Sequence, residues 1–289
     1  MKTNWTEIAS ELNYAVKNYV GLTKMIVQIR NRAHAYGIEP ENEQLICGSR
    51  TKTGKEKTTG LETLKGMASR KIERILKDFP IWTDWLVNVP GIGPVIGGQL
   101  VALYYFKSIA VCKECGADLD NFTCLICKKE SRGLGVLKFR SELRNFATIS
   151  SWWHFMGRHV VDNKVPKRRI MREDEDENPN DWSNLGRKLG YDIKESFNKL
   201  PSTHKYKAFA EKRKQYRLGT HPDATKGHRH NMAWNETVKL FLSHFWQVAH
   251  TLDGLEMTKP WCVQHGGHDP ESIIAPYYFN GDLENKEAA

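Results

Sequence analysis

The chain has 289 residues, a formal net charge of +9 at neutral pH and 40% hydrophobic residues. The mean hydropathy is negative, and no apolar run reaches the roughly 18 residues that a membrane span needs, so we expect no membrane-spanning segment. The first ten residues, MKTNWTEIAS, lack the apolar core of a signal peptide, which favours an intracellular protein, in the cytoplasm of a prokaryotic cell or encoded by a virus. The basic balance favours an acidic partner, of which nucleic acid is the commonest.

The first 85 residues are predicted to form an amino-terminal helical region. Apolar residues recur at helical spacing over residues 5–36, which indicates one long helix or two stacked ones. Residues 48–60, GSRTKTGKEKTTG, contain no apolar residue, and this composition is typical of a mobile loop. The helical period returns over residues 61–78, and a further short helix, IWTDWLVNV, leads into a glycine-rich segment.

That segment, VNVPGIGPVIGGQLVA at residues 87–102, matches the hairpin of a helix-hairpin-helix. The hairpin has the form hydrophobic, any residue, Gly, hydrophobic, Gly, with a small residue four places later. The matching residues are Val89, Gly91, Ile92, Gly93 and Gly97. A Walker A loop does not fit because the GK[ST] ending is missing, and a dinucleotide-binding loop would need a preceding strand and a later acidic residue.

The residue types of this hairpin suit contact with a phosphate. Glycine lets the main chain approach a phosphate closely, while Ile92 is expected to anchor the hairpin in the core. Pro94 suits the first turn of the second helix, whose exposed amides can bind an anion. We therefore expect contacts to the DNA backbone, which position the protein without reading sequence, from Gly91, Ile92, Gly93, Val95 and Gly97. In the alternative reading, the hairpin only packs helices or docks another protein.

Four cysteines form two CxxC pairs separated by eight residues, within residues 111–129: Cys112, Cys115, Cys124 and Cys127. Four thiolates at this spacing predict a closed tetrahedral zinc site, which is structural because no position is left for water. The folding of so small a knuckle would depend on the metal. An iron-sulfur cluster, a redox pair and unliganded buried thiols are the alternatives. Cys47 and Cys262 lie far from the pairs, so the pattern is not a secreted disulfide framework.

Residues 60–200 resemble a known family. The glycine-rich hairpin, followed by an aromatic-rich helix and a later WSNLGRKL helix, is similar to the carboxy-terminal transposase domain of insertion sequences of the 110/116/902 type. In that family the hairpin domain follows a RuvC-like nuclease, and residues 1–85 are too short and too helical to form one. A downstream helix of the G-N-x-x-L-R type corresponds loosely to residues 183–187. The resemblance is to stand-alone archaeal or viral forms of this domain.

The resemblance implies DNA binding more strongly than DNA strand transfer. The family's catalytic serine lies in a Ser-Gly pair, but the corresponding stretch here, VVDNKVPKRR, has no serine. Ser150 and Ser151 lie nearby without the glycine, and we interpret them as helix-start or turn residues rather than nucleophiles. We therefore assign no catalytic residue.

Basic residues, aromatic residues and histidines gather in the second half of the chain. One basic cluster is Lys167, Arg168 and Arg169, and a second lies on a predicted helix and contains Lys205, Lys207, Lys212, Arg213, Lys214 and Arg217. Both are candidates for phosphate contacts, although a solvated surface is the simpler interpretation. The rings of Trp152, Trp153, Phe155, Phe245 and Trp246 could stack on bases, but their helical spacing favours the core.

The carboxy-terminal third is rich in histidine. His221, His228, His230, His244 and His250 are followed by CVQHGGH, in which Cys262, His265 and His268 have ligand types that suit zinc. Their spacing matches no standard zinc site, so we expect surface or hydrogen-bonded histidines, with a second metal site or DNA contact as alternatives.

Together these features predict a mainly α protein that contains a helix-hairpin-helix and an inserted four-cysteine zinc knuckle. The expected domains are residues 1–85, a hairpin domain at 86–170, an acidic linker at 171–181 and a basic helical region at 182–289, where Ser183 is a predicted helix cap. The leading hypothesis is a DNA-binding protein. An active transposase or recombinase, alone or with a partner nuclease, and a zinc-stabilised protein-interaction module are the alternatives; a homo-oligomer is also compatible with each of them.

Overall fold

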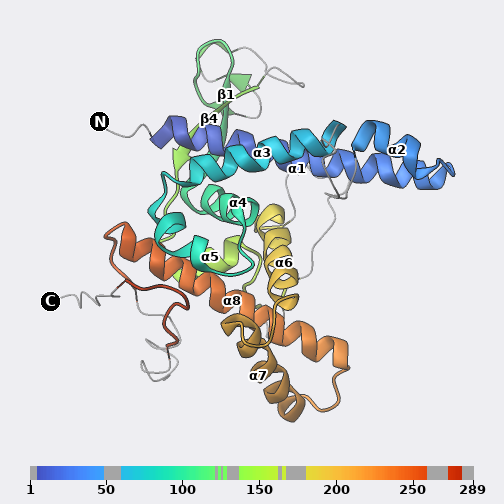
Figure 1. Cartoon of the computed structure of the whole chain (residues 1–289). Coiled ribbons are helices and arrows are strands. Elements are labelled where there is room, and N and C mark those ends of the chain that lie inside the picture. The colour runs from blue at the N-terminus through green and yellow to red at the C-terminus, as the bar shows by residue number, and fades with distance from the viewer. Residues whose placement is uncertain are drawn as a thin grey trace. The chain divides into compact units, whose positions relative to one another are not determined.

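The computed structural model describes residues 5–48, 60–120, 123–124, 126–128, 137–161, 165–166, 180–258 and 273–281. The described chain is mainly helical, as the sequence predicts (Figure 1). It divides into two compact units. Each unit combines segments that are distant in sequence: Met1–Asp78 with Gly98–Arg144, and Phe79–Gly97 with Asn145–Ala289. Most of the predicted loop at 48–60 and of the acidic linker at 171–181 lies outside the described residues.

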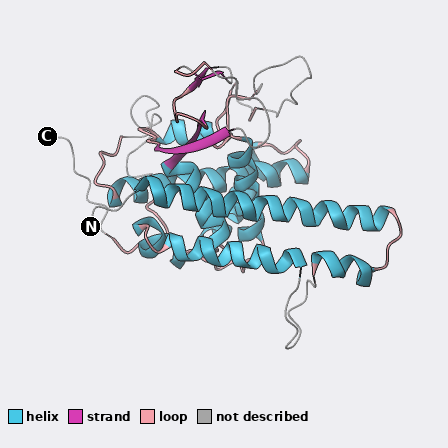
Figure 2. Ribbon diagram, turned by 90° about the horizontal axis from the view of Figure 1, so that it is seen from above, coloured by secondary structure: helices cyan, strands magenta, loops and turns pink. Residues whose placement is uncertain are grey.

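The first unit is built on two long helices, α1 (Trp5–Ala35) and α3 (Gly60–Leu76), with the shorter α2 (Pro40–Cys47) between them in sequence. The segment predicted as one or two helices is therefore the single helix α1, which packs along α3 (Figure 2). Ion pairs of Glu11 with Lys71 at 3.9 Å and of Arg30 with Glu62 at 3.2 Å show that the two helices are antiparallel. Both helices bury apolar residues, which include Leu12, Val16, Ile26, Ile72 and Leu76.

Helix α4 (Pro94–Tyr105) follows the glycine-rich turn, and from Gly98 onward it belongs to the first unit. A Cβ atom at Gly98 would collide with Cγ2 of Ile72 and would lie 3.6 Å from Cγ2 of Val16. Gly98 therefore permits the close packing of α4 against residues of α3 and α1. The next four residues, 99–102, are all buried, which accounts for the apolar residues Leu100, Val101 and Ala102 on successive sides of this helix.

The remaining elements of this unit are strands. β1 (Phe106–Cys112) pairs with β4 (Leu137–Leu143) in an antiparallel ribbon whose register runs from Phe106↔Leu143 to Cys112↔Leu137. The short strands β2 (Leu119–Asp120) and β3 (Thr123–Cys124) form a second antiparallel pair. The ribbon extends beyond the predicted cysteine module. Alternation of apolar and polar residues in LKFRSEL is the strand signal that reveals β4.

The second unit packs around α8 (Lys226–Leu252), which contacts α5 (Ile149–Phe155), α6 (Asn184–Asn198), α7 (Lys205–Thr220) and the π-helical turn η1 (Ile81–Trp85). A 3-10 turn, η2 (Leu86–Asn88), follows η1. Aromatic rings form much of the core, with Trp85 stacked on Phe241 and Phe197 stacked on Tyr206. The prediction of core positions is confirmed for Trp152, Phe245 and Trp246, which are buried, while Trp153 and Phe155 are half-buried.

Side-chain caps fix where three of these helices begin. The hydroxyl of Ser183 accepts a hydrogen bond from the amide of Gly186 at 3.0 Å, which confirms the predicted cap of α6. Thr225 caps α8 in the same way, and Thr148 caps α5 through the amide of Ser151. The Ser151 hydroxyl in turn donates to the carbonyl oxygen of Thr148 at 2.6 Å, so this serine is a helix-start residue.

Candidate functional site

The four paired cysteines come together in the first unit, in the segment that runs from the end of β1 toward the start of β4. All four Sγ atoms of Cys112, Cys115, Cys124 and Cys127 lie within 4.8 Å of one another. The Sγ of Cys112 is 3.6 Å from that of Cys127, and the Sγ of Cys115 is 3.3 Å from that of Cys124. Tetrahedral thiolates about 2.3 Å from a metal would have sulfurs about 3.8 Å apart. The cluster therefore has a geometry that could hold a metal ion.

The local backbone favours the thiolate form that binds metals. The amide of Cys127 donates to the sulfur of Cys124 at 3.3 Å. Burial raises the pKa of the Cys124 thiol, but the amides of Cys127 and Ile126 and the neighbouring thiols outweigh it and bring the pKa to about 6. Cys47 is buried in α2 and does not join the cluster, and Cys262 lies outside the described residues.

The glycine-rich turn belongs to the second unit, where Gly91 is held against α6. Gly91 has a φ of +88°, and its carbonyl oxygen accepts a hydrogen bond from the hydroxyl of Ser196 at 2.5 Å. A Cβ atom at Gly91 would lie 3.0 Å from both the Ser196 hydroxyl and Cδ1 of Leu200. Ile92 is buried, as expected for the residue that anchors the turn. Gly91 therefore serves the packing of the turn.

Gly93 has the opposite environment. It is exposed, and a Cβ atom there would meet nothing within 4 Å. Pro94 is the first residue of α4, as predicted, and the amide of the buried Gly97 donates to the carbonyl oxygen of Gly93 at 2.9 Å. Val95 is half-buried. The segment before the turn is helical but consists of the short η1 and η2 turns, so the turn joins a regular α-helix on one side only.

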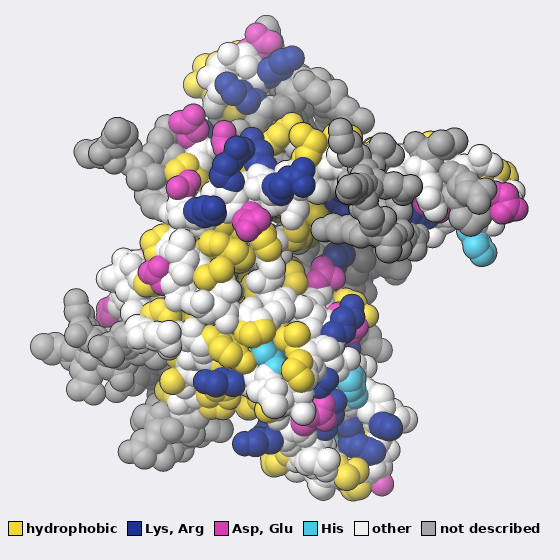
Figure 3. Space-filling model, in the orientation of Figure 1, with side chains coloured by type: hydrophobic (Ala, Val, Ile, Leu, Met, Phe, Trp, Pro, Cys, Tyr) yellow, Lys and Arg dark blue, Asp and Glu magenta, His cyan; other side chains and the backbone are white. Residues whose placement is uncertain are grey.

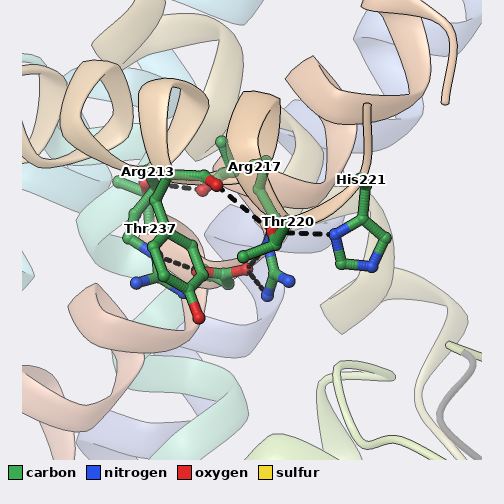
Figure 4. Close-up of polar contacts among 8 residues, drawn as sticks. Arg213, Arg217, Thr220, His221 and Thr237 are labelled. Atoms are coloured by element: carbon green, nitrogen blue, oxygen red, sulfur yellow. Dashed lines mark hydrogen bonds and ion pairs between the residues drawn. The ribbon is translucent and has the colours of Figure 1, made fainter. Parts of the chain in front are cut away.

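The second basic cluster lies on α7, and two of its arginines converge on one carboxylate of α8 (Figure 4). Arg213 pairs with Oε2 of Glu236, and Nε of Arg217 donates to Oε1 of Glu236 at 2.8 Å. The three side chains remain partly exposed. The carboxylate of Glu236 therefore neutralises part of the positive charge that the sequence suggests for phosphate contacts with DNA.

The lysines of the same cluster divide into bound and exposed groups. Lys207 donates to the carbonyl oxygens of Asn198 and Leu200 at the end of α6. Lys214 pairs with Glu211 at 2.7 Å, one turn earlier on α7. Lys205 and Lys212 are both exposed, and the ammonium group of Lys205 lies over the rings of Tyr277 and Tyr278.

A groove of about 530 Å³ runs along α7 and is lined by Lys205, Ala208, Phe209, Lys212, Arg213, Tyr216, Ile274 and Tyr277. Three cationic side chains and three aromatic rings therefore share one hollow. In the space-filling view, Lys and Arg side chains gather beside hydrophobic ones at the α7 end of this unit (Figure 3). The first basic cluster, Lys167, Arg168 and Arg169, lies outside the described residues.

Two histidines of the carboxy-terminal third, His244 and His250, are buried in the core and form hydrogen bonds. Nδ1 of His244 lies 2.8 Å from the Tyr206 hydroxyl, and its Nε2 lies 3.0 Å from the carbonyl oxygen of Ile274. Burial lowers the pKa of His244 to about 3, so the ring is neutral near pH 7. His250 is buried as well, while His221 and His230 are half-buried and His228 is exposed. His265 and His268 lie outside the described residues.

A second group of side chains that can bind a metal ion lies at the end of α5, and the sequence alone did not indicate it. Ligand atoms of His154, His159 and Asp181 are within 4.8 Å of one another. His154 and His159 are separated by four residues and could have been noticed as a pair, but Asp181 is distant in sequence.

No family model, curated protein or solved structure matches this chain. The resemblance to the transposase domain therefore stays a prediction that rests on the residues quoted above. Within the described residues, no helix combines the length and apolar character needed to cross a membrane.

Proposed function

We propose that this protein binds DNA, as a relative of transposase hairpin domains, and that a structural zinc ion holds its β module together. The observation that carries the proposal is the α7 groove, in which Lys205, Lys212 and Arg213 lie among three aromatic rings. Cations attract the phosphate backbone, and rings offer stacking surfaces to unpaired bases at about 1–3 kcal/mol per base. A groove that combines the two suits a single-stranded segment.

The glycine-rich turn offers a second contact, of a different kind. Gly93 is exposed directly before α4, where the amides at the start of the helix and the helix dipole favour an anion. Three other residues of the turn would hold it in place without contacting DNA themselves. Gly91 is hydrogen-bonded to α6, and Ile92 and Gly97 are buried. The turn would position a DNA backbone without reading its sequence.

Zinc is the metal that we assign to the cysteine cluster. Four thiolates form a closed shell, which is typical of structural zinc sites. In the described part of the module, the strands β2 and β3 are only two residues long and bury little beyond Cys124, so their stability would depend on the bound ion. The ion would supply crosslinking between the two CxxC pairs and no chemistry on DNA.

The proposal is tested by fluorescence anisotropy with labelled single-stranded, duplex and branched DNA and with RNA, over a range of salt concentrations. We expect DNA binding that weakens steeply with salt, because phosphate contacts release counterions. Single-stranded or branched DNA should bind more tightly than a plain duplex if the groove takes unpaired bases. Absence of binding to any of these ligands at low salt would contradict the proposal.

A further inference from the structure

Three side chains with metal-ligand chemistry converge around the turn that ends α5. Nε2 of His154, on the last turn of α5, lies 3.0 Å from Oδ2 of Asp181, and the rings of His154 and His159 stack with their centroids 4.0 Å apart. None of the three is part of the cysteine cluster or of the α7 groove.

The backbone fixes this convergence. Gly157 has a φ of +61° and reverses the chain after α5, and its amide donates to the carbonyl oxygen of His154 at 2.8 Å. The reversal brings His159 back over His154. The amide of Ser183 donates to the carbonyl oxygen of Phe155 at 2.8 Å, which holds Asp181 beside the same turn. Three positions that are apart in sequence are thus held together by hydrogen bonds that do not involve their side chains.

The polar atoms of this group are incompletely satisfied. Nδ1 of His159 is buried and makes no hydrogen bond with any described residue. Buried polar atoms in proteins usually have a hydrogen-bond partner, so this nitrogen atom is available to a ligand. By contrast, the side chains of His154 and Asp181 are 44% and 63% exposed, so the group is open to solvent on one side.

Two arginines border the group, and their guanidinium groups are occupied elsewhere. Arg187 donates to the carbonyl oxygen of Pro166 at 2.6 Å and lies over the ring of Trp182. Arg158 donates to Oδ1 of Asn235 at 3.0 Å. Burial is the main cause that lowers the pKa of His159.

We propose that His154, His159 and Asp181 form a binding site for a divalent transition-metal ion. Two imidazoles and one carboxylate suit zinc, iron(II) or manganese(II), and three protein ligands leave positions for water or a further ligand. The stacked imidazoles would turn about their side-chain bonds to direct nitrogen atoms at the ion. This site differs from the cysteine cluster in being open and in lacking sulfur, and it stands independently of the proposed DNA binding.

Cobalt(II) distinguishes the two sites, because thiolate ligation gives intense charge-transfer absorption and nitrogen and oxygen ligation gives only weak visible bands. The full-length protein is first loaded with one equivalent of zinc for the cysteine cluster and is then titrated with Co²⁺. We expect a second equivalent of metal, counted by elemental mass spectrometry, with a spectrum that has no thiolate band.

Matched variants locate that second equivalent. Removal of a residue that only hydrogen-bonds to a metal ligand already lowers metal affinity about 10–100-fold. H159Q and D181N remove proposed ligands themselves, so each should weaken Co²⁺ binding by more than about 100-fold. Asp181 is an exposed side chain, so D181N should fold even if H159Q does not. H228Q, at an exposed histidine of α8, and H265Q, in the CVQHGGH segment, should bind Co²⁺ as the unchanged protein does.

Two results would overturn the proposal. One is the absence of a second equivalent in the unchanged protein. The other is a second equivalent that D181N retains at full affinity, or that is lost instead in H265Q, which would place the metal on the histidine-rich segment.

Discussion

The hydroxyl of Ser196 donates a hydrogen bond to the carbonyl oxygen of Gly91 at 2.5 Å, which fastens the glycine-rich turn to α6. This contact gives the two glycines of the turn different roles. Gly91 faces the protein in a conformation that other residues avoid, whereas Gly93 faces solvent. A substitution at Gly91 therefore reports on folding, and only a substitution at Gly93 reports cleanly on DNA contact.

Gly91→Ala should destabilise the second unit. Alanine at a φ of +88° is strained by about 1–3 kcal/mol, and its Cβ atom would crowd Ser196 and Leu200. Urea unfolding followed by circular dichroism measures the change in the free energy of unfolding. Gly93→Ala is the matched control; its Cβ atom meets no neighbour, and because alanine is only a poorer helix cap than glycine, it should cost no more than about 1 kcal/mol. Equal effects at the two positions would refute the packing role of Gly91.

Gly93→Asp should preserve folding and weaken DNA binding. Aspartate directly before α4 can cap the helix and interacts favourably with its dipole, so the free energy of unfolding should stay unchanged or rise by up to about 1 kcal/mol. The same carboxylate would repel a phosphate at the turn. Anisotropy titrations should show weaker duplex binding for Gly93→Asp than for Gly93→Asn, which offers a neutral cap. If the two variants bind DNA equally, the turn does not contact the backbone.

Removal of the Glu236 charge should raise DNA affinity while lowering stability. Glu236 pairs with both Arg213 and Arg217, so Glu236→Gln frees two cations beside the groove. We expect a loss of about 1 kcal/mol in the free energy of unfolding, because the pairs are partly exposed, and tighter binding of single-stranded DNA at low salt. An unchanged or lower affinity in a folded variant would show that these arginines act only in packing α7 against α8.

Acid should destabilise the protein in part through His244. The folded protein holds the pKa of His244 at about 3, while the unfolded chain binds a proton below about pH 6.5. Because the unfolded state then binds more protons, the free energy of unfolding falls as the pH drops below about 6.5, by up to about 1.4 kcal/mol per pH unit from this residue. His244→Gln should reduce that slope between pH 6.5 and 4.5. Identical slopes in the two proteins would exclude His244 as the source.

Chelation of the metal should unfold the β module selectively. Under reducing conditions, a strong zinc chelator should remove the hydrogen-exchange protection of peptides from β2 and β3, because this two-residue pair depends on the ion. Peptides from α8, in the other compact unit, should keep their protection. Unchanged protection in β2 and β3 after verified removal of the metal would show that the cysteine cluster is not structural.

Local sequence signals predicted the features that depend on neighbouring residues. The cap by Ser183, the helical character of the segment that forms α1 and the cluster of two CxxC pairs each follow from spacing within a short stretch. Contacts between segments that are distant in sequence could not be predicted in this way. The charge of Arg213 and Arg217 looked available until folding placed Glu236 against them, and Asp181 joined His154 only through the backbone bond from Ser183 to Phe155. Such pairings depend on tertiary packing, which residue spacing does not encode.

The central claim, that the α7 groove holds DNA, is tested most directly by charge reversal at Lys212. This exposed lysine lines the groove, and Lys226, exposed at the start of α8, provides a matched control outside the groove lining. Affinity for a single-stranded oligonucleotide is measured over a series of salt concentrations. We predict that Lys212→Glu weakens binding and reduces the salt slope by about 1, while Lys226→Glu changes both far less. Equal affinities and salt slopes in the two variants would contradict the account.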